Sequence, residues 1–193
     1  MLFRSVRDAT DADRTTIDDF LAHHSFPVKV IYVTGEDMFD EIRAFGAYAL
    51  RLQLDTFLGG NFSRVLYLDS DTLAIDDLSS LFEINFNGNF IAAVDDFMKE
   101  IQHNIKRCES LGIKFGQYFN SGIILFNWPL MISEKIFDKT RTYINSRKLR
   151  IPDQDALNAV VANRWLRLPV GWNFGSPFHS HLSLNPQIGR AHV

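Results

Sequence analysis

Two aspartates separated by one residue follow a short apolar segment and have the chemistry of a metal site. Residues 64–68 read RVLYL, and Asp69-Ser70-Asp71 comes directly after them. Carboxylates held in a turn can present oxygens to one hard divalent cation, with waters or diphosphate oxygens completing its coordination. A pair of aspartates at this spacing is equally typical of a loop that caps a helix. The pair predicts a metal site only if other functional residues lie beside it.

Further polar residues stand where predicted strands or helices begin or end. They are Asp95 and Asp96 after residues 90–94, Asn120 and Ser121 before residues 122–126, and Asp153, Gln154 and Asp155 after Pro152. Open α/β sheets bind ligands outside the carboxyl ends of their strands. A carboxylate also suits the start of a helix, but capping accounts for only one aspartate of the Asp-Gln-Asp triplet. We therefore expect these residues to meet at one edge of a sheet.

The apolar pattern predicts strands that alternate with helices. Short runs rich in β-branched residues predict strands at residues 27–33, 64–68, 90–94 and 122–126. Helical spacing predicts helices at residues 11–22, 42–58, 100–111, 130–147 and 154–163. This alternation favours one α/β domain with a mostly parallel central sheet and helices on both faces.

The composition is that of a globular domain and excludes several classes of protein. The chain has 193 residues, 46% of them apolar, and its 20 basic against 23 acidic residues give a formal net charge of −3. That charge offers no basic field for a nucleic acid. No apolar run reaches the roughly 18 to 20 residues of a membrane-spanning helix. The single cysteine, Cys108, excludes an internal disulfide and suits a reducing compartment such as the cytoplasm.

Four segments together resemble the successive signatures of glycosyltransferase family 8. They are residues 64–73 (RVLYLDSDTL), 118–127 (YFNSGIILFN), 152–158 (PDQDALN) and 168–174 (LPVGWNF). Their order and spacing match the family over most of residues 6–178. The resemblance implies a GT-A fold, which is a Rossmann-like sandwich, and an enzyme that transfers a hexose with retention of anomeric configuration. It also implies UDP-glucose or UDP-galactose as donor and Mn²⁺ or Mg²⁺ as metal.

The resemblance assigns metal and donor contacts. Asp69 and Asp71 match the Asp-x-Asp pair that binds the metal, and Ser70 between them matches a position near the ribose. Arg51 matches an arginine that contacts the donor, since a guanidinium is a planar fork of donors suited to phosphate or sugar oxygens. Without the family, a solvated arginine on a helix is the simpler interpretation.

Sugar contacts are also implied by the resemblance. Asp95 matches the aspartate beside the sugar and the acceptor, whereas we expect Asp96 to face solvent or to cap the next segment. Asn120 and Ser121 match residues that contact the sugar ahead of the second core strand.

The Asp-Gln-Asp triplet carries the implied catalytic residues. Asp153 matches the carboxylate that holds donor sugar hydroxyls, Gln154 the group beneath the anomeric carbon, and Asp155 a supporting residue. Retention by double displacement needs a nucleophilic carboxylate under the ring. Because an amide is a poor nucleophile, Gln154 favours front-face attack through an oxocarbenium-like state. Asp153 or Asp155 is the fallback nucleophile.

Parts of the family pattern have no counterpart in the chain. The family begins with a strand that grips the uracil, and we expect this chain to start beyond it. The family also places a late histidine on the metal and a lysine on the diphosphate, and no C-terminal segment here matches them. His179 and His181 come too early and lack the following glycine and lysine, so we expect an exposed pair rather than a metal site.

Both ends of the chain match translated sequencing adapters. The matching segments are residues 2–5 (LFRS) and 188–193 (IGRAHV). We therefore expect residues 6–186 to be a single GT-A domain that is incomplete at both ends, and residues 1–5 and 187–193 to be non-native. A chain of this kind is expected to bind its donor weakly.

Other functions remain open. The same fold can serve a non-catalytic sugar- or nucleotide-binding module, or the chain can be an inactive fragment of an enzyme. A phosphotransferase or nucleotidylyltransferase would need a basic or glycine-rich loop ahead of the carboxylates, and none is present. The family implies a glycan, a lipopolysaccharide core or a protein-linked sugar as acceptor. It also places the full-length parent in the cytoplasm or at the inner face of the membrane.

Overall fold

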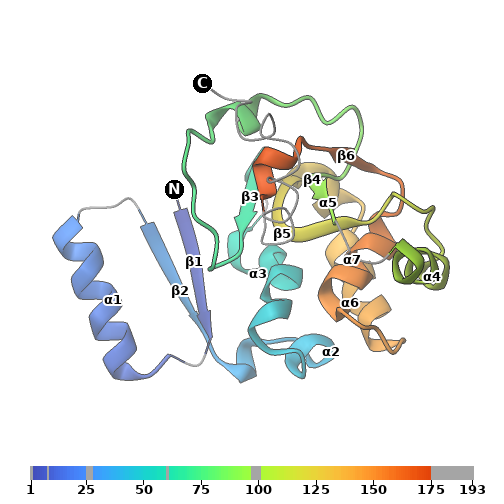
Figure 1. Cartoon of the computed structure of the whole chain (residues 1–193). Coiled ribbons are helices and arrows are strands. Elements are labelled where there is room, and N and C mark those ends of the chain that lie inside the picture. The colour runs from blue at the N-terminus through green and yellow to red at the C-terminus, as the bar shows by residue number, and fades with distance from the viewer. Residues whose placement is uncertain (1, 8, 25–27, 60, 97–100, 175–193) are drawn as a thin grey trace.

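The structure, a computed structural model, describes residues 2–7, 9–24, 28–59, 61–96 and 101–174 (Figure 1). The strands are β1 (Leu2–Arg7), β2 (Val28–Val33), β3 (Arg64–Leu68), β4 (Ile91–Asp95), β5 (Phe119–Asn127) and β6 (Trp165–Arg167). The α-helices are α1 (Asp11–His24), α2 (Asp40–Arg43), α3 (Leu54–Leu58), α4 (Ile101–Leu111), α5 (Trp128–Ser133), α6 (Ile136–Asn145) and α7 (Pro152–Val161). The 3-10 helices are η1 (Gly35–Asp37), η2 (Gly46–Gln53), η3 (Ser79–Glu83) and η4 (Val170–Asn173).

The strands form two sheets. β1 and β2 are parallel and are connected through α1, since parallel strands need a crossover. The central sheet has the order β3-β5-β4-β6, in which β5 is antiparallel to β3 and β4, while β4 and β6 are parallel. The predicted α/β class with a central sheet is confirmed. The sheet is mixed rather than mostly parallel, because an apolar run predicts burial on both faces and not strand direction.

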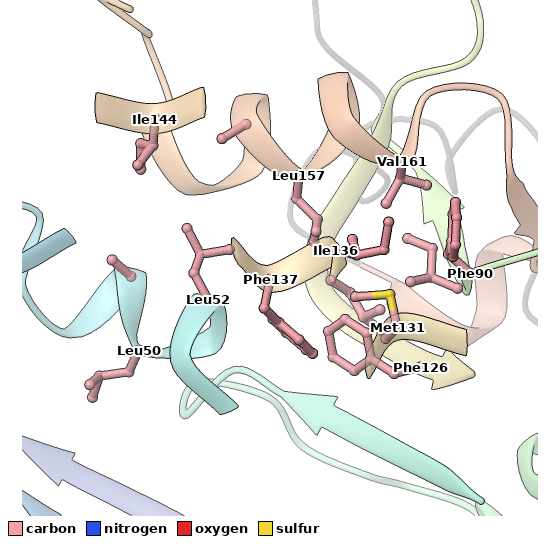
Figure 2. Close-up of a cluster of buried hydrophobic side chains, with 14 of the residues drawn as sticks. Leu50, Leu52, Phe90, Phe126, Met131, Ile136, Phe137, Ile144, Leu157 and Val161 are labelled. Carbon is pink, nitrogen blue, oxygen red and sulfur yellow. The ribbon is translucent and has the colours of Figure 1, made fainter. Parts of the chain in front are cut away.

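Side chains on both faces of the central sheet are buried. Alternate residues of β4 point to opposite sides, so Ile91 and Ala93 join one apolar cluster whereas Ala92 and Val94 join a second. Side chains from α2, η2, α5, α6 and α7 fill the first cluster (Figure 2). In the described residues, the second is covered by η3, η4 and their flanking segments. Among the described residues, the α-helices that pack on the central sheet therefore lie on one face, which corrects the expectation of helices on both.

Two predicted helices are interrupted. Residues 42–58 are divided among α2, η2 and α3, and the predicted end at Gly59 is confirmed by its positive φ of 71°. Residues 130–147 are divided between α5 and α6 at Lys135, whose φ is 53°. The pieces on both sides of each break place apolar side chains in the first cluster. Tertiary packing thus overrides the continuous helical pattern.

The predicted domain limits stay a prediction. β1 includes residues 2–5, which are expected to be non-native, and its pairing with β2 does not bear on their origin. Residues 187–193 lie outside the described residues. Among the helices that the structure describes, none has the length and apolar character needed to cross a bilayer.

Phe137 anchors α6 in the first cluster, so its removal should destabilise the fold. The side chain is 2% exposed, and its ring centroid lies 5.7 Å from Phe126 and 5.4 Å from Trp128. We expect Phe137→Ala to lower the free energy of unfolding by about 3–5 kcal/mol, measured by urea denaturation with tryptophan fluorescence. Phe115→Ala is the matched control: Phe115 is 56% exposed, so its loss should cost about 0.5 kcal/mol or less. Equal losses would contradict this assignment of the core.

Candidate functional site

A buried arginine, Arg51 of η2, joins carboxylates from two separate elements. Its Nη2 lies 2.8 Å from Oδ1 of Asp69, and its Nε lies 3.1 Å from Oδ2 of Asp153. Its Nη1 donates to both the carbonyl oxygen and the hydroxyl of Ser121. The guanidinium also lies over the Tyr67 ring, 4.7 Å from its centroid. The interpretation of Arg51 as a solvated arginine is therefore wrong, because the residue is only 4% exposed and each guanidinium nitrogen has a partner.

The backbone of η2 is held in place on both sides of Leu52. Gln53 donates from Nε2 to the carbonyl oxygen of Asp37 at 2.6 Å and accepts a backbone N–H at Oε1. Arg141 of α6 donates to the carbonyl oxygen of Leu52 at 2.7 Å. Gln53 thus satisfies backbone groups at the end of η1 and the start of α2, and Arg141 satisfies one in η2, all of the kind that short helices leave unpaired. The position of Arg51 is thus fixed by its neighbours in the chain.

Asp69 lies where β3 ends, and its carboxylate lies against β5. Oδ1 accepts hydrogen bonds from Arg51 and, at 2.7 Å, from the Tyr67 hydroxyl. Oδ2 lies beside Gly122, where an added Cβ would come within 3.0 Å of this oxygen and of Oδ1 of Asn120. Glycine at this position lets both polar side chains approach the strand. The carboxylate of Asp69 is held by side chains, as in an ion pair, and not by a helix terminus.

Asp153, in the first turn of α7, is the second carboxylate that pairs with Arg51. It is 6% exposed. Burial raises the pKa of Asp153, and the nearby charge of Arg51 opposes that rise. The pairing lets this buried residue remain ionised, because an unpaired buried carboxylate would take up a proton instead.

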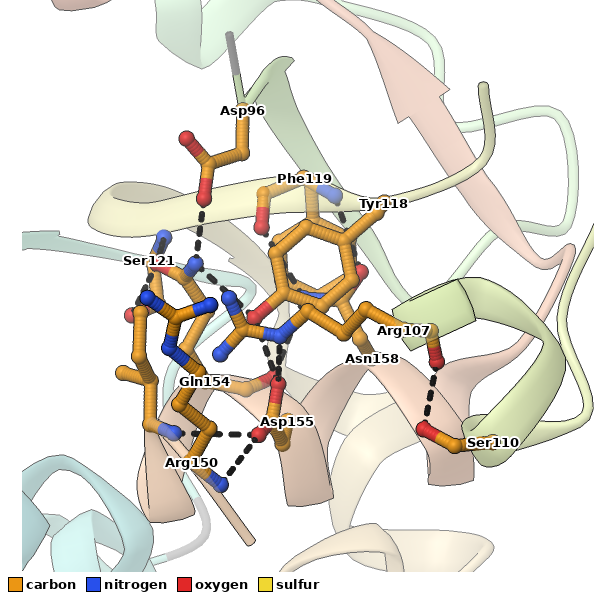
Figure 3. A network of polar contacts seen from close by, with 11 residues as sticks. Asp96, Arg107, Ser110, Tyr118, Phe119, Ser121, Arg150, Gln154, Asp155 and Asn158 are labelled. Carbon is orange, nitrogen blue, oxygen red and sulfur yellow. Dashed lines mark hydrogen bonds and ion pairs between the residues drawn. The ribbon is translucent and has the colours of Figure 1, made fainter. Parts of the chain in front are cut away.

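Both oxygens of Asp155 are engaged by the protein. Oδ1 accepts from Nε of Arg107 and from the hydroxyl of Tyr118, each at 2.7 Å (Figure 3). Oδ2 accepts from the backbone N–H groups of Arg150 and Ile151, each at 3.0 Å. Asp155 therefore fixes the start of α7 to α4 and to Tyr118, the residue before β5.

The side chain of Gln154 reaches the segments that contain Ser121, Tyr118 and Asp96. Both its amide oxygen and its amide nitrogen are hydrogen-bonded. Oε1 accepts from the backbone N–H of Ser121 at 2.9 Å. Nε2 donates to Oδ2 of Asp96 at 2.6 Å and to the Tyr118 hydroxyl at 3.0 Å (Figure 3). The expectation that Asp96 faces solvent or caps a segment is therefore wrong. The side chain turns inward because Gln154 supplies a donor beside the end of β4.

Three predicted residues lie outside this network. Ser70 and Asp71 are in an exposed turn after β3, and within the described residues their side chains make no hydrogen bond or ion pair. Asp95 forms a two-pronged pair with Arg167 of β6, at 2.5 Å from Nε and 2.9 Å from Nη2. Arg51 thus contacts polar residues of β5 and α7 directly, whereas the Asp71 carboxylate lies at the surface.

The carboxylates after β3 offer part of a metal site. The part of the chain that the structure describes contains no group of three or more His, Cys, Asp or Glu side chains placed to hold a metal. His179 and His181 lie outside the described residues. Mg²⁺ is commonly held by one or two carboxylates, with waters and substrate phosphates as its other ligands. Asp69, through Oδ2, and the exposed Asp71 fit that donor set.

Several site residues were not singled out from the sequence. Asn158 bonds the backbone N–H and carbonyl of one β5 residue, and Asn173 donates to Oδ1 of Asn120 at 2.8 Å. Both asparagines lie within the segments that resemble the family, so their place in those segments could have marked them as site residues. Arg107 lies in none of those segments, and only the fold brings its helix to Asp155.

Comparisons with known proteins agree on one family. A family model described as "Glycosyl transferase family 8" matches residues 38–189. General stress protein A of Bacillus subtilis is 32% identical over 118 residues, which are 58% of this chain and 40% of that protein. Lipopolysaccharide 1,2-glucosyltransferase of Escherichia coli is 30% identical over 129 residues, 66% of this chain and 38% of that protein. The chain thus spans about two fifths of the length of these relatives.

Solved structures of LgtC share the fold. An active-site mutant of LgtC has a TM-score of 0.74 at 24% identity, covering 93% of this chain and 66% of that chain. The galactosyltransferase LgtC in complex with donor and acceptor sugar analogs has a TM-score of 0.73 at 22% identity, covering 96% and 70%. These similarities identify the GT-A type of fold.

Removing the Arg51 cation should destabilise the protein in a pH-dependent way. We expect Arg51→Met to lower the free energy of unfolding at pH 7 by about 3–5 kcal/mol, because two carboxylates lose their partner. The pKa of Asp153 is already raised by burial and should rise further, so this carboxylate gives up its charge more easily as the pH falls. The variant's deficit should therefore be smaller at pH 5 than at pH 7.

Urea denaturation at both pH values measures this difference. Arg164→Met is the control, because that side chain is 49% exposed and its ion pair with Glu134 is 3.7 Å long. Its loss should cost less than about 1 kcal/mol. A deficit for Arg51→Met that is the same at pH 5 and pH 7 would contradict the prediction.

Proposed function

The chain belongs to glycosyltransferase family 8, and from this we propose that it carries the donor site of a retaining, metal-dependent hexosyltransferase. The donor would be UDP-glucose or UDP-galactose. The observation that carries the proposal is the buried Arg51, which joins Asp69, Ser121 and Asp153 in one network. Relatives named lipopolysaccharide glucosyltransferase and galactosyltransferase support a hexose as the transferred group.

Asp69 and Asp71 would hold Mn²⁺ or Mg²⁺, with waters and diphosphate oxygens as the other ligands. When bound, the ion would offset the charge on the departing UDP. Arg51 occupies Oδ1 of Asp69 and leaves Oδ2 for the ion. Ser70 would lie near the ribose. Because the Arg51 guanidinium is engaged by the protein, it would act on the donor mainly by fixing these carboxylates.

The sugar would bind between the start of β5 and the start of α7. Asn120, Ser121 and Asp153 would contact its hydroxyls, and Asp95, paired with Arg167, would lie on the acceptor side. The charge of Asp153, kept by its Arg51 partner, would stabilise an oxocarbenium-like state.

Gln154 would lie beneath the anomeric carbon without attacking it. An amide is a poor nucleophile, and both ends of this one are hydrogen-bonded. Asp155 has both oxygens engaged, which supports a positioning role over that of a fallback nucleophile. Front-face attack by the acceptor is therefore the preferred route to retention.

The acceptor would be a glycan, a lipopolysaccharide core or a protein-linked sugar. The relatives named for lipopolysaccharide synthesis favour the second of these. Such an acceptor would place the parent protein in the cytoplasm, at the inner face of the membrane.

Metal removal and the Asp71→Ala change test the proposed site. In the full-length parent, we expect Mn²⁺-dependent hydrolysis of UDP-glucose or UDP-galactose to be lost in EDTA and restored by added Mn²⁺. Asp71→Ala should lower that rate at least about 100-fold, since the ion no longer has its second carboxylate. Asp76→Ala, an exposed aspartate in the following loop, is the matched control. Equal rates for wild type and Asp71→Ala would remove the metal hypothesis, and no hydrolysis in wild type would favour a binding module.

Front-face transfer predicts that no covalent sugar–protein intermediate accumulates. We expect proton NMR of the first product to show the anomeric configuration of the donor. Intact-mass and peptide analysis after acid quench should show no hexose on the protein. A hexosyl adduct on Asp153 or Asp155 would establish double displacement instead.

A further inference from the structure

The Gln154 amide is held by donors on one side and by acceptors on the other. Its Oε1 accepts from the Ser121 N–H at 2.9 Å and contacts the Ser121 hydroxyl at 3.2 Å. Its Nε2 donates to Asp96 and to the Tyr118 hydroxyl. Both lone-pair directions and both N–H groups of the amide are therefore used by the protein.

The groups at the two ends of this chain of hydrogen bonds determine which atom donates and which accepts at each step. Arg51 can only donate, so the Ser121 hydroxyl must accept from it at 2.9 Å and give its own proton to Gln154. An ionised carboxylate can only accept, so Asp96 requires an N–H from Gln154. The Tyr118 hydroxyl gives its proton to Asp155 and is left to accept from Gln154. Each neighbour thus selects the same orientation of the amide.

Asp96 is the member of this set that directly follows β4, whereas the other groups belong to η2, to β5 and the residue before it, and to α7. Burial raises the pKa of Asp96; the hydrogen bond from Gln154 and the charge of Arg107 oppose that rise, and the charge of Asp155 adds to it. The carboxylate therefore depends on the Gln154 N–H to stay ionised.

We propose that Asp96 is a positioning residue, whose carboxylate orients the Gln154 amide and makes the site accept an amide but not a carboxylate at position 154. The catalytic consequence rests on the proposed glycosyl transfer, while the positioning itself does not. A carboxylate at position 154 would face Asp96 across 2.6 Å without a proton between them. It would also leave the Tyr118 hydroxyl without its donor.

Moving the carboxylate from position 96 to position 154 in two steps tests the proposal without any donor substrate. We expect Gln154→Glu to lower the melting temperature at pH 7 by roughly 6 °C or more, because a buried and a half-buried carboxylate then repel each other. The loss should shrink toward pH 5, where the pair takes up a proton. Adding Asp96→Asn returns an N–H between the two side chains, so the double variant should recover at least about half of the loss.

The neighbouring aspartate provides the matched control. Asp95→Asn removes the same charge one residue away, but Asp95 pairs with Arg167 and makes no hydrogen bond to Gln154. Added to Gln154→Glu, it should give no recovery. A double variant with Asp96→Asn that is as unstable as the summed single changes, or an equal recovery with Asp95→Asn, would overturn the proposal.

The NMR chemical shifts of the Gln154 side-chain amide provide a second test. In ¹⁵N–¹H spectra it is the resonance pair that disappears in Gln154→Glu. We expect the pair to shift with pH as Asp96 titrates, and the shift to vanish in Asp96→Asn. A shift that persists in Asp96→Asn would trace to Asp155, acting through Tyr118, and would overturn the role of Asp96. Because neither measurement requires sugar transfer, failure here is distinct from failure of the proposed function.

Discussion

The site depends on one buried cation that pairs with two carboxylates. Arg51 contacts Asp69 at the end of β3 and Asp153 at the start of α7, which are distant in the sequence. Like charges at these positions would repel without it, and burial, which raises the pKa of Asp153, would favour protonation of that carboxylate. A lysine would supply the charge but not the planar fork that reaches two carboxylates and Ser121 together. The negative charge that the proposed chemistry needs is therefore a property of the fold around Arg51.

A buried cation of this kind needs a rigid backbone, and the interrupted helix provides it. A continuous helix over residues 42–58 would present Arg51 in regular helical register. In the 3-10 helix η2, Arg141 satisfies the carbonyl of Leu52, and the Gln53 side chain ties the end of η2 to the carbonyl of Asp37 in η1. Arg141 is itself held by Asp55. The break that the apolar pattern did not predict is thus the feature that positions the arginine.

The sequence predicted the ends of β3 and β4 and the polar residues beside them, because apolar runs and the residues after them are local features. It placed Asn120 and Ser121 before a strand at residues 122–126, but β5 begins at Phe119 and contains both. It also predicted that Asp153, Gln154 and Asp155 exceed what capping requires, and their burial agrees. It did not predict strand direction, the inward turn of Asp96 or the contact of Arg107 with Asp155. Each of these depends on which segments meet after folding, and residue spacing carries no such information. The roles of Asp71 and Asp95 toward a ligand remain predictions for the same reason.

The direction of the hydrogen bonds links the two halves of the site. Arg51 donates at one end and Asp96 accepts at the other. Between them, the Ser121 hydroxyl accepts from Arg51 and donates to Gln154, and Gln154 donates to Asp96. Reversing any member would place donor against donor or acceptor against acceptor, and in a buried network each such mismatch carries a desolvation penalty. The carboxylate beside β3 and the amide at α7 are therefore not independent parts. A ligand bound to Asp69 would act on the same set of hydrogen bonds that holds Gln154, so in the proposed function donor binding would be coupled to the orientation of the Gln154 amide.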